Sequence, residues 1–563
     1  MREKGKRLPG TMKKAIAALG ILLAGLSAHG VLVFTDYVLW DGFWYHSQLA
    51  IPGSPGMRRL FYEIGRPMDY WFVLPSAWLP GPFLPKILSL AAWVLTPLLV
   101  WRVLRRAALL PSSLAWGVAL IAAVVPCFDV LGDVSVMPNA LAVLLFWLGW
   151  TLVPGPPAIL RRAAACALFL VSFNLNSQLV YFYAVGAFLL FARLVALDSR
   201  EPARDALRLA VARPELAILP VVFWIGKSLL TPNSGAYAEY NRPVFRLDVF
   251  ASGLEGFRTG FAEGTLREIA SLPAWVFLVA ALAFLVGIAV CRIPKVARIL
   301  ASEPVMPFQW IVPLGGVFLA VAAAFPYIAV GQAFSSEGWL SRNTILQPVP
   351  VGLCVAGLLL WLSSAVFPRK PGFWLPTLLA LVAIFSIASN ANFLRLQALG
   401  AKQEAVSKHL AWEISKNRPV VIQVRDMLPI PGTIPYYPPV VWSQLAAGLG
   451  NVPAAFVVET STLVREKAAP ERHGGKTLQP LIPVNRGFLD QMINQTTVPY
   501  LFDHIPRQGS QILVLVEPKN PVGSPAAFGA HYVFAKWLDP VRRQKMVDGI
   551  ADFRIFEIPS ISE

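Results

Sequence analysis

Carboxylates and arginines are concentrated between the first two hydrophobic segments of the chain, in residues 35–71. The carboxylates are Asp36, Asp41, Glu63 and Asp69, and the arginines are Arg58, Arg59 and Arg66. A fixed carboxylate can take a proton from a nucleophile, and guanidinium groups make bidentate contacts with phosphate oxygens. This mixture suits acid–base chemistry and phosphate binding, and it is more than a simple connection requires.

Asp41 is the first candidate for the acid–base group, in the sequence WDGFWYH. Gly42 lets the backbone turn, and the aromatic residues suit a membrane interface. A carboxylate here could accept a proton from a nucleophile that attacks an activated sugar, or it could cap a helix that begins near Phe43. Asp36, in TDY, is the second candidate, with a cap or a loop acid as its alternative role.

A second acidic loop, PCFDVLGDVSVMPN, holds Asp129 and Asp133 just before the fourth hydrophobic segment. Two acids four residues apart could coordinate a divalent cation such as Mg²⁺ or Mn²⁺, or help to position an acceptor. Both are also favourable residues near a helix N-terminus. No cofactor is therefore fixed by the sequence, and an assisting cation stays open.

Four arginines are candidates for binding the phosphate of a lipid at the membrane surface: Arg58, Arg59, Arg66 and Arg342, the last in FSSEGWLSRN. Guanidinium suits this role because its planar fork matches phosphate oxygens. The alternative is salt bridging to Glu63, Asp69 or Glu337, or to lipid headgroups. Their grouping on a face otherwise poor in positive charge favours phosphate binding.

The composition places these residues on a membrane protein. Hydrophobic residues make up 56% of the 563 positions, charged residues 14%, and the mean hydropathy is +0.57. The net charge of +17 comes from Lys and Arg that lie between apolar segments and form no solvated basic domain. Nucleic-acid binding is therefore not expected.

About eleven segments are apolar and long enough to cross a bilayer. They are residues 15–34, 84–101, 114–128, 136–153, 163–175, 177–193, 215–230, 273–291, 309–330, 345–366 and 373–391. With the N-terminus in the cytoplasm, each short loop on that side is basic, as the positive-inside rule requires. We expect a multi-pass protein of a bacterial inner membrane whose first segment is a retained signal anchor.

An odd number of spans puts residues 392–563 outside the cytoplasm. Short β-rich stretches at 420–424, 455–458, 512–516 and 553–558 predict a soluble α/β domain there. Residues 1–391 form the membrane domain, with outer loops at 35–83, 129–135, 231–272 and 331–344. Long loops often carry function, and Tyr237, Tyr240 and Arg242 in the third are candidates for an acceptor-binding or lid role.

The acid and aromatics that open the first outer loop, the second acidic loop, about eleven spans and the extracytoplasmic domain together resemble the GT-C superfamily of membrane glycosyltransferases. The resemblance implies a catalytic acid matching Asp41 and a sugar donor carried on polyprenyl phosphate or pyrophosphate. Asp129 and Asp133 could match the acidic metal ligands of the oligosaccharyltransferase branch.

The chain also departs from the branches of that superfamily. Asp-Gly stands where mannosyltransferase-like and aminoarabinose-transferase-like members have Asp-Glu, and residues 392–563 lack the tryptophan-rich acceptor motif of oligosaccharyltransferases. No branch is assigned on this basis.

The predicted function is transfer of a sugar from a polyprenyl-phosphate-linked donor to a cell-envelope glycan, lipid or protein acceptor on the outer side of the membrane, with membrane lipids as surroundings. Two other readings stay open. A lipid-linked glycan transporter or flippase predicts ionisable groups in the middle of the spans. A non-catalytic envelope-assembly scaffold predicts that the region of Asp41 tolerates change.

Overall fold

The computed structural model describes most of the chain. The described residues are 10–39, 41–50, 54–78, 81–106, 110–153, 158–176, 178–196, 201, 204, 208, 211–234, 243–244, 246–294, 310–366, 374–428, 439–447, 453–459, 484–495, 502, 504–520 and 522–561. The candidates Tyr237, Tyr240 and Arg242 lie outside them.

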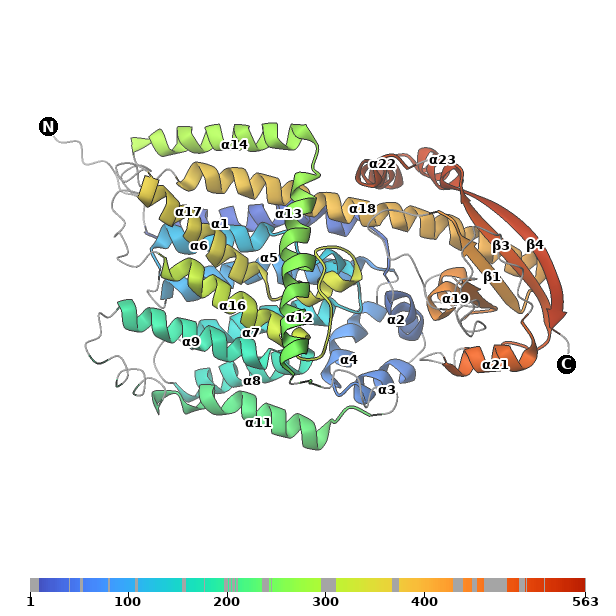
Figure 1. The fold of residues 1–563 in the computed structure, drawn as a ribbon, viewed down its shortest axis with the longest axis horizontal. Coiled ribbons are helices and arrows are strands. Elements are labelled where there is room, and N and C mark those ends of the chain that lie inside the picture. The colour runs from blue at the N-terminus through green and yellow to red at the C-terminus, as the bar shows by residue number, and fades with distance from the viewer. Residues whose placement is uncertain are drawn as a thin grey trace.

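Helices occupy all of the predicted apolar segments and pack side by side into one bundle (Figure 1). They are α1 (Gly10–His29), α5 (Phe83–Arg106), α6 (Ser112–Val124), α7 (Met137–Leu152), α8 (Ile159–Leu175), α9 (Leu179–Ala196), α11 (Pro214–Leu230), α14 (Ala274–Arg292), α16 (Ile311–Ile328), α17 (Pro348–Val366) and α18 (Trp374–Asn417). They are apolar nearly all round, as helices surrounded by other helices and lipid must be.

In the described part of the chain, 6 helices are long and apolar enough to cross a membrane. They are Lys14–Phe34, which joins α1 to the short helix η1 (Gly30–Phe34), together with α5, α14, α16, α17 and α18. Three further apolar helices, in α6, α7 and α9, are shorter. The chain is therefore a helical membrane protein, and the number of spans stays a prediction.

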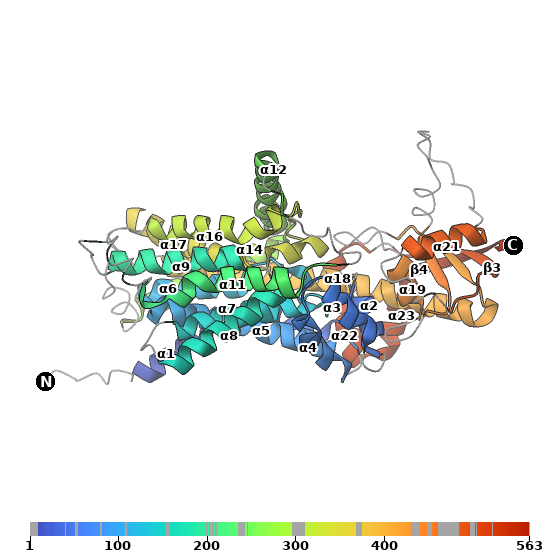
Figure 2. The ribbon, with the colours of Figure 1, turned by 90° about the horizontal axis from the view of Figure 1, so that it is seen from below.

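The last helix of the bundle does not end at the predicted domain boundary. α18 runs unbroken for 44 residues, from Trp374 to Asn417, so residue 392 falls inside it. Its first half lies in the bundle and its second half reaches the C-terminal sheet (Figure 2). The apolar run ends near residue 391, but the helical backbone continues because the following residues, mainly Ala, Leu, Lys, Gln and Glu, favour a helix.

The four predicted strands are confirmed. β1 (Val421–Asp426), β2 (Phe456–Glu459), β3 (Gly509–Pro518) and β4 (Ala551–Ile561) form one sheet in the order β2-β1-β3-β4. β1 is parallel to β2 and β3, while β4 is antiparallel to β3. The parallel strands are continuous apolar runs, as strands covered on both faces usually are. The accompanying helices are α19 (Pro439–Ala447), α21 (Arg486–Gln495), α22 (Pro525–Leu538) and α23 (Pro540–Ile550).

Short helices lie between the bundle and the sheet. The first loop forms α2 (Asp41–Ala50), α3 (Pro55–Glu63), α4 (Met68–Val73) and η2 (Leu74–Ala77). The third of the predicted outer loops forms α12 (Leu247–Phe257) and α13 (Glu263–Ala270), joined by a π-helical turn, and these cross the bundle helices (Figure 1). The second and fourth loops form η3 (Asp129–Gly132) and η6 (Trp339–Thr344).

Lys402 joins α18 to the sheet. Its side chain is 8% exposed, and its ammonium group pairs with the carboxylate of Asp426 at the end of β1. The same group donates a hydrogen bond of 2.6 Å to the carbonyl oxygen of Leu428. A buried pair of this kind holds two elements in one arrangement, because separating its charges leaves one of them desolvated.

We expect Lys402→Met to destabilise the protein by about 3 kcal/mol, because it leaves the Asp426 carboxylate buried without its cation. Thermal unfolding in detergent measures the loss, and adding Asp426→Asn should restore part of it. Lys408→Met is the matched control on the same helix, since Lys408 is 50% exposed and pairs with Glu404. Equal losses for the two lysine variants would contradict the role of Lys402.

Candidate active site

Residues 35–39, which lead into α2, form a segment without regular secondary structure whose backbone is held largely by side chains. A buried segment outside a helix or a sheet must find partners for its N–H and C=O groups elsewhere. Gln397 accepts from the N–H of Asp36 at 2.7 Å, and Gln403 accepts from the N–H of Val38 at 3.3 Å and donates to its carbonyl at 2.6 Å. Two side chains of α18 therefore hold the backbone of the first loop by hydrogen bonds.

Lys86, near the start of α5, completes this support. It is fully buried, and its ammonium group donates to Thr35 Oγ1 at 3.0 Å and to the carbonyl oxygen of Tyr37 at 3.1 Å. The same group lies 4.1 Å from the centre of the Tyr37 ring. Sequence reasoning missed Lys86, Gln397 and Gln403. The available signal was a polar side chain inside or next to a predicted span, which is costly unless it is paired.

Asp41 is the first residue of α2 and is exposed, although protein surrounds it closely. The carboxylate is therefore crowded by protein but still reached by solvent. Burial raises its pKa to about 6, with the charge of Asp133 acting in the same direction and that of Arg342 acting against it. The helix N-terminus beneath it favours the ionised form. A carboxylate of this kind changes protonation state near neutral pH.

Asp133 holds the loop that carries Asp41. Its carboxylate accepts hydrogen bonds from the N–H of Leu39 at 2.8 Å, the N–H of Ser135 at 2.9 Å and the hydroxyl of Ser135 at 2.6 Å. The backbone of Gly42 packs directly on the same carboxylate and leaves no room for a side chain. Asp133 is thus bonded to the segment that leads into α2, while Asp41, the first residue of that helix, is exposed.

Asp129, four residues earlier, lies in a different cluster. Its carboxylate accepts from Asn392 Nδ2 at 2.9 Å and from the N–H of Gly338 at 3.2 Å, and Arg395 is 3.4 Å away. Arg395 also pairs with Glu337 at 3.1 Å. This cluster joins the second and fourth loops to α18.

Glu268 on α13 belongs to the same cluster as Asp129. Its carboxylate accepts from Asn392 Nδ2 at 3.3 Å, and its Oε1 has no hydrogen-bond partner within the described ranges. Burial and the neighbouring carboxylates of Asp129 and Glu337 raise the pKa of Glu268, while Arg395 opposes them. Two carboxylates that share one amide group hold a proton more readily than either would alone.

Asp36 attaches the first loop to the C-terminal part of the chain. Its carboxylate pairs with Lys536 of α22 at 2.6 Å and accepts a hydrogen bond from Gln397. Burial would raise the pKa of Asp36, but Lys536 and these hydrogen bonds outweigh it and lower the pKa below its ordinary value. The carboxylate is therefore ionised and engaged, unlike that of Asp41.

The four candidate arginines have different partners. Arg342 lies over the ring of Trp339 at 4.7 Å and acts electrostatically on Asp41. Arg66 pairs with Asp69 at 2.9 Å and donates to Asn139 at 2.9 Å. Arg59 is 75% exposed and pairs with Glu63, while Arg58 lies 5.9 Å from the ring of Tyr62. Arg342 is thus the candidate arginine whose charge acts on Asp41.

The described residues do not fit a metal ion in the acidic second loop. They contain no group of three or more His, Cys, Asp or Glu side chains that could hold one. The oxygens of Asp129 and Asp133 face N–H, O–H and guanidinium donors, whose hydrogens occupy the directions that a cation would need. We therefore assign no metal ion to this loop.

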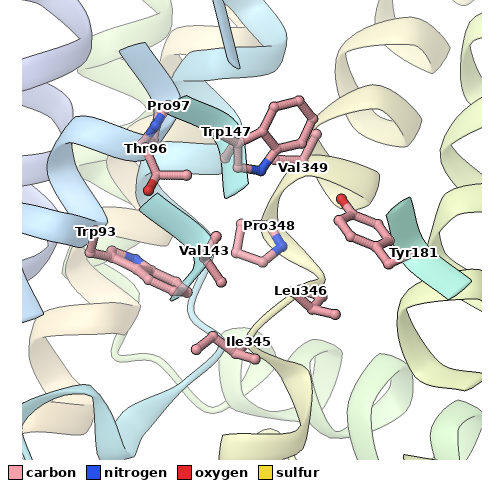
Figure 3. Close-up of a pocket in the computed structure, with 11 residues that line it drawn as sticks. Trp93, Thr96, Pro97, Val143, Trp147, Tyr181, Ile345, Leu346, Pro348 and Val349 are labelled. Atoms are coloured by element: carbon pink, nitrogen blue, oxygen red, sulfur yellow. The ribbon is translucent and has the colours of Figure 1, made fainter. Parts of the chain in front are cut away.

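A narrow apolar cavity lies inside the bundle, and none of these carboxylates lines it. Its lining includes Trp93, Val143, Trp147, Tyr181 and Pro348, from α5, α7, α9 and α17 (Figure 3). The hydroxyl of Tyr181 has no hydrogen-bond partner among the described residues. The cavity contains no charged group and so adds nothing to the acid–base chemistry.

Comparison with known proteins gives little further guidance. No protein-family model matches the chain, and no curated protein matches it. One solved structure that does match is ArnT from Cupriavidus metallidurans in the apo state, at 11% identity and a TM-score of 0.32, over 90% of this chain and 93% of that chain. A likeness this low assigns neither a family nor an activity, so the resemblance drawn from the sequence stays a prediction.

Glu268→Gln should make the protein less sensitive to alkaline pH. Because its folded pKa is raised, Glu268 contributes stability that is complete below about pH 4.3, its unfolded pKa, and is lost as the pH rises toward the folded value. Glutamine cannot ionise. As the pH is raised from 5 into the alkaline range, the free energy of unfolding of the variant should therefore increase by ~2 kcal/mol relative to that of wild type. Thermal unfolding at several pH values measures this difference.

Glu263→Gln is the matched control, because Glu263 is on the same helix, 46% exposed and paired with Arg258. A stability difference between wild type and Glu268→Gln that is the same at every pH would contradict the protonated state of Glu268.

Proposed function

We propose that this chain is a membrane glycosyltransferase that moves a sugar from a polyprenyl-phosphate-linked donor to a cell-envelope glycan, lipid or protein acceptor. The observation that carries the proposal is the contrast among the loop carboxylates. Asp36, Asp129 and Asp133 are engaged by donors, whereas Asp41 is reached by solvent, has a pKa of about 6 and lies in the field of Arg342.

Asp41 acts as the general base in this proposal. It takes the proton of the acceptor hydroxyl while the acceptor oxygen forms a bond to the anomeric carbon of the sugar. The bond from that carbon to the phosphate oxygen breaks, and the polyprenyl phosphate leaves with the electron pair. A base with a pKa near the working pH combines a large ionised fraction with a useful proton affinity.

Arg342 is the first candidate for binding the leaving phosphate, whose negative charge grows as the glycosidic bond breaks. A guanidinium group fixed over Trp339 is available for this purpose without reorganisation. Arg66 is second, because its pairing with Asp69 leaves it less free. We assign Arg58 and Arg59, which are exposed, to the approach of the charged donor.

The remaining residues support the base. Asp133, Lys86, Gln397 and Gln403 fix the segment before α2 and so fix the direction of Asp41. Precise placement of this kind is worth several orders of magnitude in rate when a base must meet one hydroxyl group. We propose the acceptor or lid role for Tyr237, Tyr240 and Arg242 as well.

Asp41→Asn should reduce the rate of sugar transfer by ~10²–10⁴-fold, because the amide cannot take the proton. The protein would be reconstituted in proteoliposomes with a panel of polyprenyl-phospho-sugars, and product formation would be followed by mass spectrometry. Glu63→Gln is the matched control, since Glu63 is in the same loop but pairs with the exposed Arg59.

Two outcomes would overturn the proposal. Normal turnover by folded Asp41→Asn would remove the base. Transfer of labelled lipid across the bilayer, with no panel member consumed, would replace the transferase by a transporter.

The pH dependence of kcat/KM should depend on both Asp41 and Arg342. In wild type, kcat/KM should rise with pH through about 6, where Asp41 loses its proton. Arg342→Ala removes a charge that lowers this pKa, so the rising limb should move to higher pH, and the plateau should fall by ~10²-fold. Arg342→Lys keeps the charge, so its kcat/KM should rise at a pH nearer that of wild type.

Arg554→Ala serves as the control, since Arg554 is 67% exposed on β4 and pairs with Glu517. An acidic limb that does not move in Arg342→Ala would show that Arg342 does not act on the base.

A further inference from the structure

α22 of the C-terminal region carries a stripe of exposed apolar side chains. Phe534 is 56% exposed and Leu538 68% exposed, and they lie one helical turn apart on the same face. Trp537 beside them is 51% exposed, and Val541 at the start of α23 is 67% exposed. A continuous stripe of large apolar side chains on a domain outside the bundle needs a partner.

Trp537 shows where this stripe lies relative to the membrane. Its ring contacts the rings of Phe34 and Phe83, with centres 6.1 Å and 6.0 Å apart, and its Nε1 donates to the carbonyl of Phe34 at 3.2 Å. Phe34 is the last residue of one candidate membrane span and Phe83 is the first residue of another. Trp537 therefore lies at the level where two spans meet the membrane surface, a level that tryptophan favours.

α22 is fixed rigidly at this level. It crosses α18 so closely that Gly529 leaves no room for a side chain against the carbonyl of Leu394, near the end of the apolar part of α18. Lys536 ties the same helix to Asp36. Two exposed tryptophans of the first loop, Trp71 and Trp78, belong to α4 and the end of η2, and Figure 1 places α4 at about the same level along the bundle axis.

We infer that α22 is a membrane-interface helix, with Phe534, Leu538 and Val541 inserted into the leaflet on the side of the sheet. The occupant of the stripe is the bilayer itself, because Trp537 connects the stripe to Phe34, which is 49% exposed and ends one candidate span, and to Phe83, which begins another. An amphipathic helix that buries one apolar face at this depth is a known way of holding a domain on a membrane. The C-terminal region is thereby anchored by lipid as well as by α18.

The test uses the full chain in lipid nanodiscs that hold one copy each. A spin label at Leu538→Cys is compared with one at Phe556→Cys on β4, where Phe556 is 43% exposed but lies in the sheet. The free cysteines Cys127, Cys166, Cys291 and Cys354 are replaced by serine. We expect the label at 538 to be several-fold more accessible to oxygen and less accessible to a water-soluble nickel chelate than the label at 556.

A second measurement avoids all substitutions. Wild-type protein in nanodiscs is cross-linked to a phospholipid with a photoactivatable group high on its acyl chain, and the adducts are mapped by mass spectrometry. Adducts on residues 534–541 that exceed those on β4 support the inference. Equal nickel access at both labels, or no adducts on α22, would overturn it. So would protection of the 538 label that arises only when two copies share a disc, because the occupant would then be a second copy.

Discussion

The structure around the candidate site depends on satisfying the backbone of residues 35–39. Here the chain leaves a candidate membrane span and runs without regular secondary structure through a buried region before α2 begins. With neither a helix nor a sheet to pair with, its N–H and C=O groups would each cost about 1–3 kcal/mol if left unpaired. Gln397, Gln403, Asp133 and Lys86 supply the partners.

This solution connects parts of the chain that are far apart in sequence. The glutamines come from α18, the lysine from α5 and the aspartate from the second loop, so the first loop can hold its shape only when these elements are packed together. The same arrangement explains the division among the carboxylates. Asp133 bonds the backbone of the first loop, and Asp36 bonds the C-terminal region. Because these neighbours fix the loop, Asp41 keeps a solvent-accessible carboxylate.

The helices and strands could be predicted from the sequence because their signals are local. Long apolar runs must be helical in a membrane, and short β-branched runs between turn residues favour strands. The partners of the first loop could not be predicted in this way. Gln397 and Gln403 look like ordinary polar residues of a helix, and Lys536 lies 500 residues from Asp36, with which it pairs. The continuation of α18 beyond residue 392 could not be predicted from hydropathy, which falls there although the helical backbone continues to Asn417.

The length of α18 has a mechanical consequence. A helix of 44 residues measures about 66 Å, more than twice the hydrocarbon thickness of a bilayer. Gln397 and Gln403 of this helix form hydrogen bonds with the first loop, and Lys402 bonds it to the end of the sheet. In a bilayer that is thinner than the apolar half of α18, the helix tilts. The first loop and the sheet, which are both bonded to α18, then move together with it. Membrane thickness thus sets the height of the candidate site above the lipid while leaving its internal geometry unchanged.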